Sequence, residues 1–177
     1  MKHLIFLDLE TTGLREDKDP ILELAMVAVA LPTFAVVAEF SNVIRPDIWS
    51  TVKRNLHEKV ATMHAASGLS AELDSGAGVA AHIVEGLAVN FVNAHAPQTL
   101  AWHTPLAGAN PDFDRRFLRK QMPKLHRAFS YRSFDVRTLT LLSDWVSGTQ
   151  LSEGAPHRAL ADCRKAISDV RRFLGLT

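Results

Sequence analysis

Two acidic residues lie at the end of an apolar run near the N-terminus. In "IFLDLETTGL" the run ends at Asp8, and Glu10 follows two positions later. Because side chains alternate along a β-strand, both carboxylates are expected on one face of the strand. Like charges this close repel each other, and a hard divalent cation such as Mg²⁺ or Mn²⁺ would remove the repulsion. The pair can equally be the polar end of a strand that runs into a Thr-Thr-Gly turn. The choice between a cation site and a plain strand end therefore depends on other residues of the chain.

Two further acids lie near the start of expected helices. Asp114 is in the first turn of a helix that follows a strand, where it could lean over the end of a sheet. Its alternative role is to compensate the helix dipole, which Asp112 could do by itself. Asp162 lies one turn into the last expected helix, and Ala159 and Ala166 leave room on its side for another group to approach.

His157 stands at the entrance of the last expected helix, directly after Pro156. An imidazole exchanges protons near neutral pH and can therefore act as a general base. The alternative is an exposed loop histidine, since the chain has eight histidines. A catalytic interpretation of His157 thus depends on the acids that accompany it.

The composition is that of one globular domain. The 177 residues are 47% hydrophobic, which is enough for a sizeable core, so we expect a single domain over residues 1–177. The net charge of +1 excludes a strongly basic coat, so any contact with nucleic acid would be local. The single cysteine, Cys163, excludes an internal disulfide and favours a reducing compartment.

Neither apolar region near the N-terminus has the features of a targeting or membrane segment. The first apolar run ends at Asp8, which argues against a signal peptide. The second, Leu24 to Val37, is interrupted by Pro32 and is shorter than the roughly 20 residues that span a bilayer. We therefore expect a soluble, cytoplasmic protein that does not contact membranes.

Apolar periodicity predicts strands first and alternating strands and helices later. Strands over Lys2 to Leu9, Ile21 to Leu31 and Phe34 to Ile44 would form an antiparallel meander. Shorter strands are expected at Leu106 to Ala109 and Tyr131 to Val136. The predicted fold class is α/β, with a mixed central sheet, an antiparallel three-strand start and flanking helices.

Helical signals fill the intervals between these strands. An apolar stripe predicts a helix after a loop over Ser70 to Gly78, and its members are Val79, Ile83, Leu87 and Phe91. Asn110 can cap the next helix, and Pro111 suits its first position. Further helical spacing covers Asp47 to Ala61, Thr138 to Trp145 and Arg158 to Phe173, with a loop over Ser147 to Pro156 before the last.

Three segments together resemble the motifs of the DEDD-type 3′–5′ exonucleases of the histidine subclass (DEDDh). They are "DLETTGL" from Asp8, "NPDFD" from Asn110 and "HRALAD" from His157. They occur in the order that the family has, and the likeness covers nearly the whole chain. The resemblance implies a ribonuclease-H-like fold and a metal-dependent hydrolase that releases nucleoside 5′-monophosphates from a 3′ end.

The resemblance also implies a role for each catalytic candidate. Four carboxylates would bind two divalent cations, Mg²⁺ or Mn²⁺, in a two-metal mechanism. Asp8 would bridge the two cations, Glu10 and Asp162 would complete the site of the attacking water, and Asp114 would serve the second cation. His157 would take the proton from that water as the general base.

The turn after the first acids is a candidate for substrate contact. In relatives this turn touches the terminal nucleotide, which implies contacts from Thr12 and Gly13 and a wedge between bases from Leu14. Gly13 can also serve simply to make a tight turn. Among the basic residues, Arg115 and Arg158 lie nearest the acids and are the better candidates for binding phosphate.

Within this family the chain most resembles oligoribonucleases, which cut very short RNA. The extra likeness lies in "HAASGL" from His64, "DRRFLRKQMPKL" from Asp114 and "YRSFDVRTL" from Tyr131. It implies a homodimer in which Tyr131 reaches the active site of the partner, Arg132 grips the 5′ phosphate of the substrate, and His64 contacts the substrate near the metals. The alternative for Tyr131 is an aromatic residue of a strand packed in the core.

Four positions depart from the oligoribonuclease pattern, in the cap that limits substrates to short RNA: Asn110, Phe113, Arg137 and Leu141. Asn110 is kept as a candidate substrate contact, since it occupies a cap position. These departures leave a single-stranded DNA 3′–5′ exonuclease of the proofreading or repair type as an alternative. A catalytically inactive module that binds nucleic acid is a third.

Overall fold

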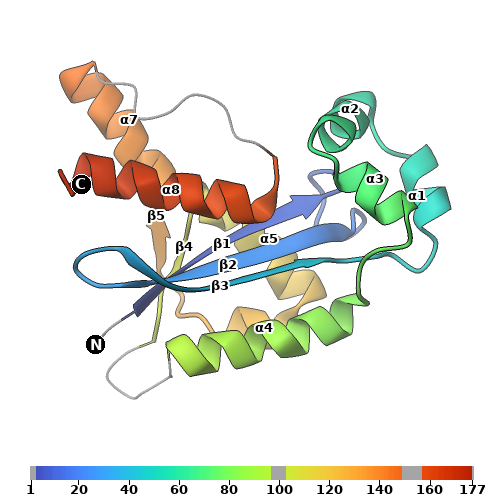
Figure 1. Ribbon diagram of the computed structural model, residues 1–177, viewed down its shortest axis with the longest axis horizontal. Coiled ribbons are helices and arrows are strands. Elements are labelled where there is room, and N and C mark those ends of the chain that lie inside the picture. Colours follow the sequence, from blue (N-terminus) through green and yellow to red (C-terminus); the bar gives the residue numbers. More distant parts are fainter. Residues whose placement is uncertain (1–2, 97–102, 149–156, 177) are drawn as a thin grey trace.

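The fold is built on one mixed five-stranded sheet (Figure 1). A computed structural model describes residues 3–96, 103–148 and 157–176. The strand order is β3-β2-β1-β4-β5. The strands are β1 (His3–Thr11), β2 (Ile21–Ala30), β3 (Ala35–Val43), β4 (Leu106–Gly108) and β5 (Ser133–Asp135). The antiparallel β1–β2–β3 meander is confirmed, and β4 and β5 continue the sheet parallel to β1.

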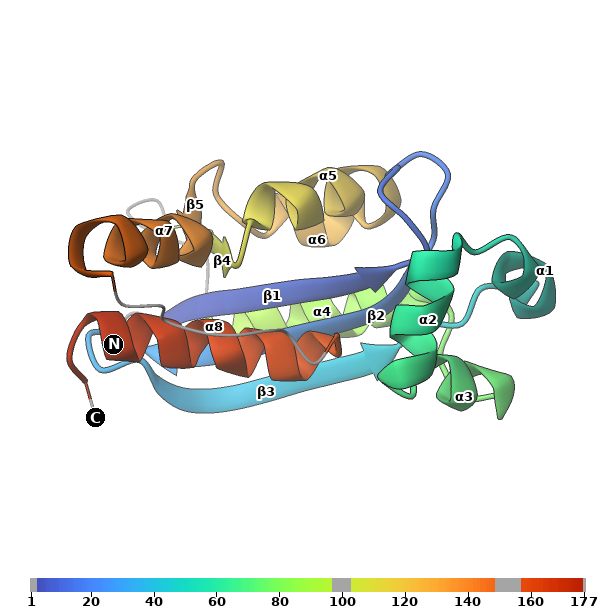
Figure 2. The same cartoon turned by 90° about the horizontal axis from the view of Figure 1, so that it is seen from above.

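Helices cover both faces of the sheet and one of its ends (Figures 1 and 2). One face carries α4 (Ala81–His95), α5 (Pro111–Gln121) and α6 (Pro123–Arg127), and the other carries α7 (Val136–Ser147) and α8 (Ala159–Phe173). Three short helices lie beyond the carboxyl end of β1: α1 (Trp49–Arg54), α2 (Glu58–Ala66) and α3 (Leu69–Asp74). The predicted α/β class with flanking helices is therefore correct.

The alternation of side chains along β1 divides the core into two halves. Ile5, Leu7 and Leu9 pack with α4, α5 and α6, whereas Leu4 and Phe6 pack with α7 and α8. Asp8 and Glu10 continue the second set, because they are two and four positions beyond Phe6. The strand thus directs both carboxylates towards the face that α8 covers.

The predicted apolar stripe of α4 is correct at Phe91, which packs partly buried against the core, and wrong at two positions. Ile83 and Leu87 are exposed, whereas Val84, Ala88 and Val92 are buried in the core. Val79 does not belong to the helix and bridges to Ile44 instead. Two overlapping apolar stripes exist in this alanine-rich segment, and only the position of the sheet selects between them.

Other local predictions also need correction. Residues 70–74 were expected in a loop but belong to α3, because Leu69 and Leu73 anchor that short helix in a small core with Trp49. Asn110 occupies the N-cap position of α5 with a left-handed backbone (φ 63°), yet its side chain makes no capping bond. The backbone N–H of Asn110 instead donates to Asp135 Oδ1 (3.0 Å), and this bond joins the start of α5 to β5.

Some predicted segments fall outside the part of the chain that the structure describes. These are Lys2 of the first strand and residues 149–156 of the predicted Ser147 to Pro156 loop, so the position of Pro156 is among them. Within the described residues, none of the helices is long and apolar enough to cross a membrane.

The packing of α4 makes a prediction that two neighbouring residues can test. Val84→Ala should lower the free energy of unfolding by about 2 kcal/mol, because it removes two buried methyl groups from a closed core. Ile83→Ala, on the exposed side of the same turn, should cost less than about 1 kcal/mol. Urea denaturation of both variants measures the difference. Equal losses, or a larger loss for Ile83→Ala, would contradict the observed orientation of the helix.

Candidate active site

The carboxylates of Asp8 and Glu10 form the base of the candidate site, near the carboxyl end of β1. Glu10 is buried, with 6% of its surface exposed, and Asp8 is half-buried. Both lie on the central strand of the sheet, which is paired with β2 on one side and β4 on the other. Their positions are therefore set by the most constrained strand of the fold.

Asp114 joins these two acids from α5. It is 3% exposed, and Leu9 N–H donates to its Oδ1 over 3.1 Å. This bond ties the first turn of α5 to β1 between Asp8 and Glu10. The structure therefore brings Asp114 to the strand as predicted, and it does more than compensate a helix dipole.

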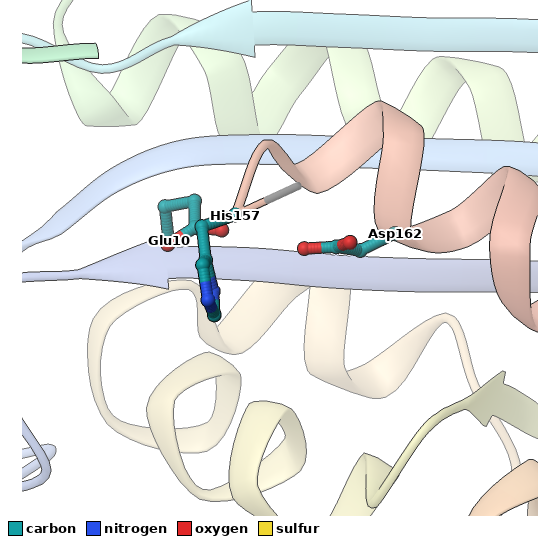
Figure 3. Close-up of side chains that lie close together, drawn as sticks. All are labelled: Glu10, His157 and Asp162. Atoms are coloured by element: carbon teal, nitrogen blue, oxygen red, sulfur yellow. The ribbon is translucent and has the colours of Figure 1, made fainter. Parts of the chain in front are cut away.

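Asp162 and His157 approach from the start of α8. One ligand atom each from Glu10, His157 and Asp162 lie within 4.8 Å of one another, an arrangement able to hold a metal ion. Figure 3 shows the side chains of these three residues gathered beside β1. His157 is exposed and adopts a left-handed backbone (φ 54°) just before the helix begins. Two segments far apart in the sequence, β1 and the start of α8, thus meet at one point.

Burial and mutual repulsion make this cluster hold protons unusually tightly. Burial, followed by repulsion from Asp114, Glu10 and Asp162, raises the pKa of Asp8 well above its ordinary value. Burial, followed by repulsion from Asp162, raises the pKa of Glu10 from 4.5 to about 8. Burial is also the main cause of the raised pKa values of Asp114 and Asp162. Groups with such pKa values cluster at functional sites.

The acid cluster fits a divalent cation. Asp162 Oδ1 is buried and has no hydrogen-bond partner, which is costly unless a cation approaches it. The donors are carboxylate oxygens with an imidazole beside them, a set that suits Mg²⁺ or Mn²⁺. Asp8, Glu10, Asp114 and Asp162 are therefore the residues that could hold such ions.

His64 forms a buried wall of the site. Its Nε2 lies 2.9 Å from the carbonyl oxygen of Thr11, and because a carbonyl can only accept, this nitrogen donates. Its Nδ1 lies 3.8 Å from Glu10 Oε2 and has no hydrogen-bond partner. Burial lowers the pKa of His64. The side chain is fully buried, so the structure places His64 behind Glu10 rather than on the open surface of the site.

The turn that follows β1 exposes one apolar side chain. Leu14 is 75% exposed, whereas Thr12 is buried and its N–H donates to the carbonyl oxygen of Pro20 (3.0 Å). A Cβ at Gly13 would lie 2.4 Å from Asp19 Oδ2, so a larger residue would displace the carboxylate that accepts from Arg15 N–H (2.9 Å). The conformation of the turn thus leaves Leu14 free for contact with another molecule.

Tyr131 and Arg132 lie away from the acids. Ser133 pairs with Leu106, which pairs with Ile5, and all three strands run parallel. At about 3.3 Å per residue, Tyr131 is therefore roughly 20 Å from Glu10 along the strand direction. Tyr131 is 83% exposed, and the guanidinium of Arg132 lies 5.2 Å from the centre of its ring. The alternative of a Tyr131 packed in the core is excluded.

The two arginines predicted to bind phosphate are already bound within the protein. Arg158 forms ion pairs with Glu23 (2.9 Å) and Glu72 (2.8 Å). Arg115 donates to the carbonyl oxygens of Ser130 (2.9 Å) and Arg132 (2.8 Å). Arg158 therefore braces the chain beside the acids, Arg115 braces the segment before β5, and their predicted role as phosphate ligands is not supported.

Sequence analysis missed Glu23, a buried acid that faces the site. It is 2% exposed and pairs in register with Glu10 across β1 and β2. Its charge contributes to the raised pKa values of Asp8, Glu10 and Asp162. The available signal was a single charge within "ILELAMVAVAL", a segment otherwise apolar on both faces.

A cavity of about 660 Å³ opens beside His157. It is lined mainly by one side of α2, including Lys59, Thr62 and Met63. The exposed face of His157 borders this space, so a molecule bound at the acids could extend into it.

The raised pKa of Glu10 predicts how pH affects the metal-free protein. Folded Glu10 keeps its proton up to about pH 8, whereas the unfolded chain releases it near 4.5. The folded state binds more protons in this window, so the stability of the metal-free protein should fall as pH rises through it. A divalent cation replaces the proton, so the increase in Tm on adding Mn²⁺ should grow over the same window.

Thermal melts with EDTA and with Mn²⁺ across this pH range measure both effects. The Glu10→Gln variant has no titrating group at position 10, so its metal-free Tm should depend less on pH than that of the wild-type protein. A Tm that rises with pH in EDTA, or a Mn²⁺ effect equal at all pH values, would contradict the assignment of these acids as a cation site.

Comparison with known proteins agrees with this geometry. The exonuclease family matches over residues 5–168. The chain is 30% identical over 181 residues to an oligoribonuclease of Pseudomonas syringae pv. syringae, covering 97% of this chain and 94% of that protein. It is 33% identical over 183 residues to an oligoribonuclease of Aromatoleum aromaticum, covering 97% and 92%.

Solved structures confirm the ribonuclease-H-like exonuclease fold. An exonuclease I structure has a TM-score of 0.71 at 15% identity, covering 97% of this chain and 41% of that one. The nuclease domain of 3′hExo, a DEDDh family member bound to rAMP, has a TM-score of 0.70 at 16% identity, covering 98% and 92%. From the family match and the identities of the oligoribonuclease relatives, the chain belongs to the exonuclease family and is a 3′–5′ exonuclease.

Proposed function

We propose that this exonuclease is of the oligoribonuclease type and hydrolyses short RNA oligonucleotides from the 3′ end to nucleoside 5′-monophosphates. The observation that carries the proposal is the meeting of Glu10, His157 and Asp162 within 4.8 Å, with Asp114 bonded to the same strand. The similarity to oligoribonucleases over 97% of the chain supports short RNA as the substrate.

The family uses divalent cations, and the four acids are proposed to hold two of them, Mg²⁺ or Mn²⁺. When bound, such ions would make a water molecule more acidic and neutralise charge on the departing oxygen. Asp8 interacts electrostatically with the other three acids and is the proposed shared ligand, while Glu10 and Asp162 lie close to His157 and Asp114 would serve the second ion. His157 is proposed to accept the proton of the attacking water, and its exposure allows it to reach a bound substrate.

The substrate is proposed to lie between the turn after β1 and the cavity beside α2. Leu14 is exposed and can insert between bases, while Thr12 and Gly13 offer the backbone that precedes it. The cavity bordered by His157 has room for one nucleoside of the substrate. Asn110 is exposed at the start of α5 and is retained as a substrate contact.

A homodimer is proposed because the exposed residues away from the acids form an apolar surface. On α7, Leu142, Trp145 and Val146 lie on one side of the helix, and the last two are 76% and 78% exposed. Tyr131 is exposed, far from the acids of its own chain, so it can serve an active site only on another chain. In the dimer, Tyr131 and Arg132 would bind substrate held by the partner.

The single cysteine supports a cytoplasmic location for the proposed enzyme. Cys163 is a free, buried thiol in α8, and the sequence offers it no partner for an internal disulfide. Chains of this kind are typical of reducing compartments.

The substrate class is tested with three labelled oligomers: an RNA dinucleotide, a longer RNA and a single-stranded DNA, each with Mn²⁺. We expect the dinucleotide to be cut fastest, with nucleoside 5′-monophosphates as products. His157→Ala should slow this reaction by about 10²- to 10⁴-fold, since it removes the general base. His82→Ala, an exposed histidine of α4, is the matched control and should leave the rate unchanged.

Each alternative predicts a different outcome of the same assay. Faster cutting of DNA or of the longer RNA would indicate a single-stranded DNA nuclease or a general exonuclease. Binding without turnover, unchanged by Asp8→Asn, would indicate an inactive module that binds nucleic acid.

The apolar side of α7 can be tested by introducing a charge. Trp145→Glu should convert the dimer to a monomer and reduce turnover of the dinucleotide, because burying a carboxylate in an apolar interface is costly. Light scattering gives the mass of the particle in solution. Leu87→Glu, at an exposed position of α4, should leave both the mass and the turnover unchanged. A wild-type monomer would refute the proposed dimer.

A further inference from the structure

Glu23 is a buried carboxylate that has no part in the proposed reaction. It lies on β2 among residues that are nearly all buried, and it is the register partner of Glu10. A charge in such a place is unfavourable unless it is paired and hydrogen-bonded. The groups that bind the Glu23 carboxylate therefore indicate its role in the structure.

Those partners all lie at the start of α8. Arg158 binds Glu23 through two nitrogens, Nε (3.1 Å to Oε2) and Nη2 (2.9 Å to Oε1). Ala159 N–H also donates to Glu23 Oε2 over 3.0 Å. The side chain of Arg158, at the N-cap position of α8, makes no capping bond, so a carboxylate from β2 caps this helix instead.

The same guanidinium also reaches α3. Arg158 Nη2 lies 2.8 Å from Glu72 Oε2, and α3 follows directly after α2, which carries His64 and lines the cavity. One side chain thus joins β2, α8 and the helices beside the substrate cavity. Bidentate pairing makes this geometry more specific than a single contact would.

The start of α8 determines where two proposed catalytic groups lie. His157 precedes Arg158 directly, with a left-handed backbone that is unfavourable for a residue other than glycine. Asp162 N–H donates to the carbonyl oxygen of Arg158 over 3.0 Å. A shift of Arg158 would therefore move both His157 and Asp162 relative to Glu10.

We propose that Glu23 is a positioning residue of the active site, which holds Arg158 and the first N–H of α8 so that His157 and Asp162 face Glu10. It also keeps the guanidinium of Arg158 occupied. Without Glu23, only Glu72 would hold this cation, and the guanidinium could turn towards Glu10 and so compete with a divalent metal ion for the same carboxylate. The inference rests on the proposed function of the acid cluster.

A second ion pair on α8 provides a matched control. Arg164 Nε lies 2.7 Å from Glu39 Oε1, and this pair also joins α8 to the sheet. Glu39 is on β3, and both side chains of this pair are partly exposed to solvent. The Glu39 pair shares the chemistry and the helix of the Glu23 pair but does not contact the start of α8.

The test compares Glu23→Gln with Glu39→Gln in the full chain. For Glu23→Gln we expect Mn²⁺ affinity and kcat on the RNA dinucleotide to fall by about tenfold to a hundredfold, with KM nearly unchanged. Calorimetric titration with Mn²⁺ alone measures the affinity independently of turnover. Glu39→Gln should match the wild-type protein in both measurements.

The double variant Glu23→Gln/Arg158→Gln distinguishes a role of Glu23 in positioning Arg158 from a contribution to protein stability alone. It removes the competing guanidinium, so it should recover part of the Mn²⁺ affinity lost in Glu23→Gln. A contribution to stability alone would lower Tm in both variants without changing the affinity for Mn²⁺. Arg158→Lys keeps the charge but loses the bidentate contact with Glu23, so it should also lower kcat. This variant replaces Glu23→Gln in the test if Glu23→Gln does not fold.

A folded Glu23→Gln variant with wild-type Mn²⁺ affinity and kcat would overturn the proposal. The proposed function is tested separately by the wild-type protein and Asp8→Asn. If the wild-type protein cuts none of the oligomers, the proposed substrate is wrong, and the Mn²⁺ titrations still decide the role of Glu23.

Discussion

Repulsion among buried carboxylates is the constraint on which the rest of this structure depends. Burial is the main cause of the raised pKa values of Asp8, Glu10, Asp114 and Asp162, and repulsion from at least one nearby acid adds to it in each case, with Glu23 as that neighbour for Asp162. Side chains that repel can stay together only if the backbone that carries them is held by other interactions. The central position of β1 and the bond from Leu9 N–H to Asp114 provide that support. The resulting arrangement of acids could hold a cation without a rearrangement of the backbone.

The approach of α8 to the sheet depends on small side chains. Ala159 and Ala166 were expected to leave room beside Asp162, but both are buried against the sheet. Their size lets the helix axis come close to β1 and β2, which brings Asp162 within reach of Glu10. The small side chains of α8 therefore allow close packing against the sheet. The pairing of Arg158 with Glu23 sets where the start of α8 lies relative to β2.

The sheet holds the acids and the exposed pair Tyr131 and Arg132 towards opposite ends. The acids lie near the carboxyl end of β1, where open α/β sheets bind ligands. Tyr131 and Arg132 lie before β5, towards the opposite end of parallel strands. One chain cannot bring these two groups together while its strands stay paired. In the proposed homodimer, a second chain would turn its own β5 end towards the acids, and the apolar side of α7 is the proposed surface that binds it.

The sequence by itself determined the strands, most of the helices and the five catalytic candidates. Apolar runs and turn residues are local signals, and "DLETTGL", "NPDFD" and "HRALAD" each combine a chemical group with its local backbone. Tertiary structure alone decided which side of α4 is buried, that residues 70–74 are helical, and what Arg115 and Arg158 bind. Those outcomes depend on contacts between segments far apart in the chain, as between Glu23 and Arg158, and no local pattern specifies the partner of a long, charged side chain.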